Sequence, residues 1–378
     1  MIENKVNASK NHEKLIHITK RLDTPRLFKV IVRAISIVTA FVICAFVLNI
    51  FKPGNFFDFF SGSFKSLVGS KKMFFNTLFE FALLLGISIA ILPAFKMKFW
   101  NLGAEGQVLM GAFGAALVSK FIGPSVPNFV CIILMVIAGM LFSAIWALIP
   151  AFFKAKFETN ETLFTLMMNY IAMGIIEFYG FVVNPSHGNF AGLTSGCFVF
   201  KDSSLYVSLS AIIPFIIVTL MTTFMFGYLN YTKNGYELSV VGETRNTAKY
   251  VGINVKKVII RTVILSGLLC GLVGYFTVAK QSSVSKDMIG GRGFTAVMIT
   301  WLGHFEVLEV TLMSFLVAFI TRGSNQVASE LNLGDSFVKI SIAVFLIVIL
   351  AFEFFLNYEV HFNFKMLKNN KNKEEVSK

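Results

Sequence analysis

Charged residues are scarce in this chain, making up 15% of its 378 residues, whereas an average soluble domain has about 25%. Cysteine is also rare, with four copies that lie far apart, and the five histidines form no cluster. The low charge argues against a soluble globular protein. The absence of metal-ligand or redox spacing predicts no metal site and a packing role for the cysteines.

A phosphate-binding loop is also missing. The glycine-rich segment 290–303 (GGRGFTAVMITWLG) lacks the preceding strand, the spacing and the Lys-Ser/Thr pair of such a loop. We interpret it instead as a tight lead into a short helix. The sequence therefore predicts no ATP binding of this kind, no cofactor and no catalytic residue.

Apolar residues are abundant: 55% of the chain is hydrophobic, with 43 phenylalanines and a mean hydropathy of +0.71. Runs of about 20 apolar residues predict an all-α fold, a polytopic transmembrane helix bundle. About ten membrane segments are predicted. The eighth and ninth are too short to span the membrane upright, which favours half-helices or a re-entrant pair. The number of spans in 285–335 is therefore left open. The segments are 28–50, 73–95, 101–120, 129–153, 161–183, 206–229, 259–279, 291–304, 308–321 and 336–356.

Basic residues indicate how the bundle is oriented. Placing both termini in the cytoplasm puts most of the 34 lysines and arginines inside, as the positive-inside rule requires. The net charge of +13 then reflects topology and anionic lipid, not nucleic acid. Three regions are expected: a polar cytoplasmic tail over 1–27, a transmembrane domain over 28–356 and a basic cytoplasmic tail over 357–378.

One polar junction interrupts the apolar segments, reading NLGAEGQ from Asn101 to Gln107. Non-helical backbone at membrane depth is tolerated where it is buried in protein or lines a water-filled cavity, and a charge there is costly. We expect Asn101, Glu105 and Gln107 to border a solute pathway. The alternative is a structural hairpin in which Glu105 caps a helix N-terminus.

A second polar segment reads TNETLFTLMMNYIA from Thr159 to Ala172. Thr159 or Asn160 is suited to cap a helix, and Asn169 then falls about two turns deeper. A buried asparagine needs a partner, so Asn169 either borders the pathway or makes an interhelical hydrogen bond.

A long cytoplasmic loop over 230–258 contains the third signal. Thr244 or Asn246 is suited to begin a short helix there, and Gly252 to end it. A short helix framed by glycines on a basic membrane face suits docking of another protein. The alternative, a lipid-facing amphipathic helix, is disfavoured because its apolar stripe is small.

Two acidic residues, Glu80 and Glu177, lie within predicted spans. Each is suited either to hold a proton or ion or to pair with a backbone donor. Their segments contain no matching basic residue, which disfavours ion coupling. Their role is left open.

These segments together resemble the permease subunits of bacterial ABC importers of the ribose, simple-sugar and nucleoside type, over about 76–356. The paired NLGAEGQ and NE…MNYIA segments are most similar to the nucleoside branch. The resemblance implies a dimeric permease core, two cytoplasmic ATP-binding subunits and an extracytoplasmic substrate-binding protein, in the bacterial cytoplasmic membrane. The coupling pattern of the family matches at Gly242, Asn246, Ala248, Gly252 and Ile253.

The expected function is therefore inward passage of a neutral polar solute by alternating access, with ATP hydrolysed by a partner subunit. A nucleoside is favoured, and ribose, another simple sugar or riboflavin are the alternatives. The polar loop 184–204 would dock the binding protein. An ion-coupled secondary transporter and a membrane-embedded enzyme are the rival classes, and neither a homodimer nor a heterodimer is favoured.

Overall fold

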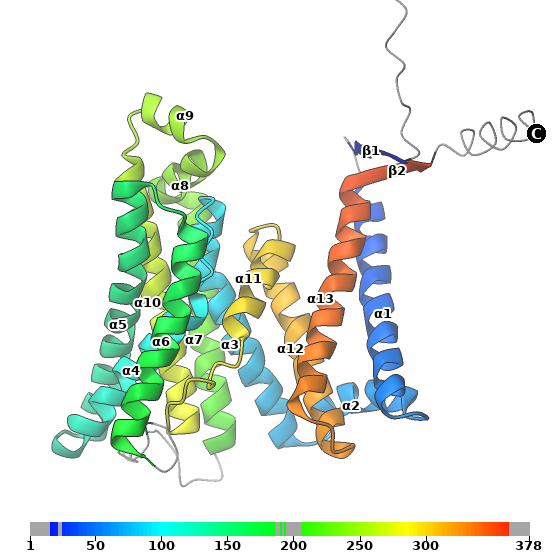
Figure 1. Cartoon of the computed structure of the whole chain (residues 1–378), viewed down its shortest axis with the longest axis horizontal. Coiled ribbons are helices and arrows are strands. Elements are labelled where there is room, and N and C mark those ends of the chain that lie inside the picture. Colours follow the sequence, from blue (N-terminus) through cyan, green and yellow to red (C-terminus); the bar gives the residue numbers. More distant parts are fainter. Residues whose placement is uncertain (1–15, 22–24, 186–189, 191–192, 194–205, 363–378) are drawn as a thin grey trace, which may run out of the picture. The chain divides into compact units, whose positions relative to one another are not determined.

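The computed structural model describes residues 16–21, 25–185, 190, 193 and 206–362. These residues are almost entirely helical, as predicted, with one antiparallel pair of strands (Figure 1). The loop 184–204, expected to dock a binding protein, lies mostly outside the described residues. The elements are β1 Ile16–Lys20, α1 Arg26–Phe51, α2 Phe56–Val68, α3 Lys71–Lys96, α4 Ala104–Phe121, η1 Gly123–Ser125, α5 Asn128–Phe157, α6 Glu161–Val183, α7 Tyr206–Tyr231, α8 Lys233–Glu243, α9 Arg245–Tyr250, α10 Val255–Gln281, α11 Arg292–Leu302, α12 Val307–Glu330, α13 Asp335–Asn357 and β2 Tyr358–Phe362.

Eight of the described helices are long and apolar enough to cross a membrane, namely α1, α3, α5, α6, α7, α10, α12 and α13. Two shorter helices, α4 and α11, account for the other predicted segments. The eighth segment is indeed short, because α11 has 11 residues. The ninth is not: α12 has 24 residues. Polar residues such as Asn325 end the apolar run at 321, yet the helix continues to Glu330, and Asn325 donates to the Thr321 carbonyl of the same helix.

The chain forms two compact units, over 58–338 and over 1–57 with 339–378. In the smaller unit α1 packs on α13, where the Phe41 and Phe345 rings lie 5.9 Å apart. Strands β1 and β2 pair antiparallel, with Ile16 opposite Phe362. Both strands fall within regions predicted as polar tails. Their pairing brings the two described chain ends together.

The larger unit is built around α3, which packs against α7, α10, α11 and α12. Leu84, Ile87 and Leu92 are among its fully buried side chains. Outer helices instead expose large apolar groups; Phe178 of α6 is 70% exposed. A bundle buried at its centre and apolar at its surface fits a membrane environment.

Glycines bring three helices of this unit into close contact. A Cβ added at Gly111 of α4 would lie 2.6 Å from the Cα of Gly271 on α10, and one added at Gly271 would overlap the carbonyl oxygen of Gly139 on α5. Small residues allow such backbone approach in membrane bundles. Nearby, Cys131 of α5 is disulfide-bonded, so the expectation of a packing role is wrong for this cysteine.

Candidate functional site

The polar junction is a tightly bonded turn between α3 and α4. The Asn101 side chain accepts a hydrogen bond from the Gly103 N–H at 3.0 Å. The Asn101 and Gln107 amides also bond each other, at 3.4 Å and 3.2 Å. Both side chains are almost fully buried. Their polar groups therefore stabilise the turn in this conformation.

Asn169 of α6 ties the junction to a second helix. Its side-chain oxygen accepts from the Gly106 N–H, and its amide donates to the Leu102 carbonyl, both at 2.8 Å. Thr165 adds a third bond by accepting from the Leu102 N–H at 3.1 Å. A Cβ at Gly106 would come within 2.9 Å of the Asn169 oxygen. Glycine is thus required for this approach, and the interhelical bond expected for Asn169 is present.

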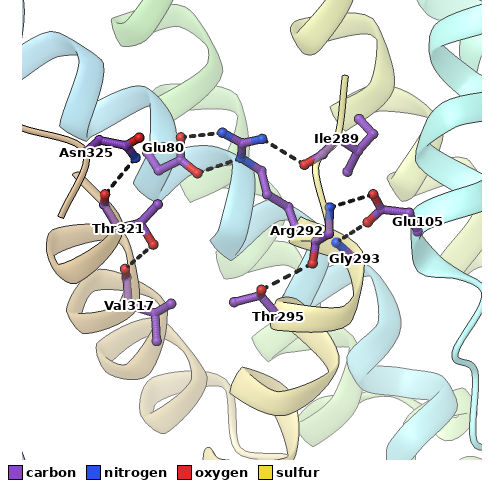
Figure 2. Close-up of polar contacts among 10 residues, drawn as sticks. Glu80, Glu105, Ile289, Arg292, Gly293, Thr295, Val317, Thr321 and Asn325 are labelled. Carbon is purple, nitrogen blue, oxygen red and sulfur yellow. Dashed lines mark hydrogen bonds and ion pairs between the residues drawn. The ribbon is translucent and has the colours of Figure 1, made fainter. Parts of the chain in front are cut away.

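Glu105 lies in the first turn of α4, but its carboxylate caps a different helix (Figure 2). One oxygen accepts from the Gly291 N–H at 2.8 Å and the other from the Gly293 N–H at 2.6 Å. These donors belong to the N-terminus of α11, whose first N–H groups lack intrahelical partners. The carboxylate also lies at the positive end of the α11 dipole. The capping interaction expected for Glu105 is therefore made across the bundle.

Helix α11 begins abruptly at this point. Its N-cap Gly291 has a φ of +84°, in the left-handed region, which glycine adopts without strain. The interpretation of 290–303 as a tight lead into a short helix is confirmed. The N-termini of α4 and α11 meet at Glu105 and Gly293. Discontinuous helices whose ends meet in this way form the solute sites of many transporters.

An ion pair between the part-buried Arg292 and the buried Glu80 holds the other side of this segment. Arg292 donates to both oxygens of Glu80 on α3, at 2.6 Å and 3.0 Å, and donates to the Ile289 carbonyl at 2.7 Å. Glu80 is 3% exposed. The segment Gly291–Gly293 is thus held between two carboxylates, one from α3 and one from α4 (Figure 2).

The expectation that Glu80 and Glu177 lack basic partners is wrong. Arg292 is 212 residues from Glu80 in the sequence. Glu177 pairs with Lys286 at 2.6 Å, and both side chains are partly exposed. Neither partner lies in the same segment as its acid, so inspection of single segments missed them. Glu80 faces the bundle interior, whereas the Glu177 pair lies at its surface.

The cytoplasmic loop contains two helices, α8 and α9. Helix α9 follows Thr244, and Gly252 has a φ of +81° beyond its end, so the short predicted helix is confirmed. Helix α8 was not predicted. It packs on α3, because a Cβ at Gly242 would overlap the Lys96 carbonyl oxygen.

The five residues of the coupling pattern divide into two sets. Gly242 and Ala248 are buried, whereas Asn246 and Gly252 are exposed and Ile253 is half-buried. The buried pair positions the two short helices. The most prominent side chain on this surface is Tyr250, which is 92% exposed. The sequence reasoning missed it, although an aromatic residue inside a polar loop is a visible signal.

Comparison with known proteins assigns the family. Residues 73–353 match the family model described as the permease component of a branched-chain amino acid transport system. The chain belongs to this family.

Similar proteins are permease subunits of ABC transporters. A guanosine permease from Bacillus subtilis is 26% identical, over 76% of this chain and 81% of its own length. A nucleoside permease from Lactococcus lactis is 27% identical, over 78% and 84%. A glucose permease from Haloferax volcanii is 25% identical, over 72% and 74%. No solved structure matches.

The chain is therefore a permease subunit of an ABC importer and a multi-pass protein of the cytoplasmic membrane. This assignment decides against a stand-alone ion-coupled transporter, although the buried acid–base pair that such a transporter predicts is present. Permeases of this family work with an ATP-binding subunit and a substrate-binding protein.

Proposed function

We propose that this permease carries a nucleoside inward, and that the solute passes beside the junction formed by Asn101, Glu105, Gln107 and Asn169. The meeting of the α4 and α11 N-termini at Glu105 carries the proposal. Two helix ends and a buried carboxylate in the bundle interior make a place where polar groups are already assembled. The guanosine and nucleoside permeases among its relatives support the choice of solute.

Access to the pathway is switched through the contacts that Glu105 and Glu80 make with Gly291–Gly293, the segment at the start of α11. With both carboxylates bound to Gly291–Gly293, α11 is fixed to α3 and α4. Movement of α3 relative to α4 would strain these contacts and shift α11. Helix α8 packs on the end of α3 at Lys96. A displacement of the cytoplasmic loop by the ATP-binding subunit would therefore be transmitted directly to α3.

The ATP-binding subunit docks on α9 and the exposed residues around it. Tyr250 projects from this surface, and Asn246 and Lys249 line a shallow pocket with it. An exposed aromatic residue flanked by polar groups is typical of an interface anchor. Hydrolysis then takes place in the partner, and this chain makes and breaks no bond.

Competition for uptake tests the solute. Cells that contain the complete importer are given labelled guanosine with an excess of unlabelled guanosine, inosine, adenosine, ribose, glucose or riboflavin. The nucleosides should block uptake and the other three should not. No uptake of labelled guanosine, together with uptake of labelled ribose, glucose or riboflavin by the same cells, would overturn the nucleoside proposal and leave the permease assignment intact. A sugar is the second candidate because of the glucose permease relative.

A further inference from the structure

A cluster of cations surrounds the Glu80–Arg292 pair, and the mechanism above does not use all of it. Lys280 of α10 donates to Asn76 at 3.1 Å and lies over the Phe79 ring at 3.8 Å. Arg322 of α12 is half-buried. The charges of Lys280, Arg292 and Arg322 all act on the Glu80 carboxylate. Positive charge therefore exceeds negative charge around Glu80.

Arg322 differs from the other members because it has no hydrogen-bond or ion-pair partner among the described residues. Both oxygens of Glu80 are already bonded to Arg292. Asn325, which lies three residues after Arg322 on α12, donates to the Thr321 carbonyl at 2.7 Å. Figure 2 shows Asn325 and Thr321 beside Glu80. An arginine within a membrane span is costly unless an acceptor or water satisfies it, and such residues mark solute pathways.

The cluster lies where an incoming solute would meet it. In the predicted orientation α3 begins at the outer face, and Glu80 is about 14 Å along the helix from Lys71. Lys280 is near the outer end of α10. The cluster therefore occupies the outer half of the bundle, between the extracellular side and the junction at Glu105.

The available groups are hydrogen-bond donors. Arginine has five N–H donors in a planar fork and lysine has three, and neither has an acceptor. A planar fork pairs with two adjacent acceptors, as with O6 and N7 of guanine. Adenine has N7 but an amino donor at position 6, which faces a donor unfavourably. This chemistry selects purines with a carbonyl at position 6.

We propose that Arg322, supported by Lys280, binds the O6 and N7 edge of a 6-oxopurine nucleoside and makes the importer favour guanosine and inosine over adenosine. The inference rests on the proposed nucleoside function and specifies the solute further. Neither group needs to change protonation, because the selection comes from the direction of the hydrogen bonds.

Uptake kinetics of R322Q, R322K and the matched control K65Q test the proposal. Lys65 forms an exposed ion pair with Glu330, at the end of the same helix. In R322Q the half-saturation concentration for guanosine and inosine should rise about tenfold or more, while that for adenosine changes less than about twofold. R322K should recover part of the loss because it restores charge without the fork. K65Q should behave like the unaltered importer.

The possible outcomes separate this inference from the nucleoside function. Uptake of nucleosides with unchanged purine preference in R322Q overturns the inference alone. Stronger competition by GMP than by guanosine also overturns it, because the cations would then bind an anion. If the unaltered importer takes up no nucleoside, both proposals are overturned. Should R322Q fail to reach the membrane, K280Q is measured instead, and it should weaken guanosine uptake more than adenosine uptake.

Discussion

Single residues in this permease act mainly by bonding the backbone of distant segments. Glu105 caps α11, Asn169 holds the turn before α4, and Arg292 ties the lead of α11 to α3. In a membrane the backbone of interrupted helices has little access to water, so side chains must satisfy it. The polar residues that attract attention in the sequence are thus structural in this conformation, beside the pathway proposed for them.

Replacing Glu105 should weaken both the fold and transport. Glu105→Ala leaves the buried Gly293 N–H and the part-buried Gly291 N–H without an acceptor, at up to about 1–3 kcal/mol each, and should lower the melting temperature of the purified complex. Glu105→Gln retains one oxygen and should lower it less. Uptake should fall in the same order, and Glu330→Gln, an exposed replacement, serves as the control. Normal melting and uptake in Glu105→Ala would show that the cap is dispensable.

Replacing one member of the Glu80–Arg292 pair should destabilise the folded protein more than replacing both members. Glu80→Gln leaves the part-buried Arg292 without its ion-pair partner, at up to about 3–5 kcal/mol, whereas the double variant Glu80→Gln/Arg292→Gln removes both charges. The melting temperature of the double variant should therefore exceed that of Glu80→Gln. Strictly additive losses in this double-mutant cycle would mean that the two side chains do not interact.

Short helices at the cytoplasmic end form the next level of organisation. Helix α8 is joined to α3 through Gly242, and α9 presents Tyr250 to the cytoplasm in the predicted orientation. We therefore propose separate tasks for the two helices: α8 transmits movement within the chain, and α9 faces the ATP-binding subunit. The sequence pattern combined both tasks in one coupling motif.

Two replacements in these helices should have different effects. Gly242→Leu should displace α8 from α3, lowering the melting temperature and uptake together. Tyr250→Ala should leave the melting temperature unchanged and uncouple ATP hydrolysis from uptake, because only the proposed contact is lost. Both are measured on the complete complex in proteoliposomes. Fully coupled transport in Tyr250→Ala would contradict docking at α9.

At the scale of the whole molecule, the basic residues and two ion pairs at helix ends bear on the topology. Lys96 at the end of α3 pairs with Glu306 before α12, and Lys65 pairs with Glu330 at the opposite end of α12. The ends of three helices are thereby assigned to two opposite faces. The positive-inside rule then decides which face is cytoplasmic.

Cysteine labelling should confirm this orientation. Ser329→Cys, near the end of α12, should react with a membrane-impermeant maleimide in intact cells. Lys249→Cys on α9 should react only after permeabilisation, and both positions are exposed. The chain with its native cysteines is the control, because Cys44 and Cys270 are buried. The reverse pattern would invert the topology.

The sequence by itself determined the all-α membrane fold, the positions of most segments, the family and the short helix before Gly252. These features depend on hydropathy, basic residues and local motifs, which add up along the chain. Only the tertiary structure decided the partners of Glu80 and Glu105, because 212 and 188 residues separate them from the groups they bind. Local patterns contain no information on such contacts, since they depend on how α11 is placed between α3 and α4. The length of α12 was underestimated because its polar residues end the apolar run in the sequence, whereas the helix continues through them to Glu330.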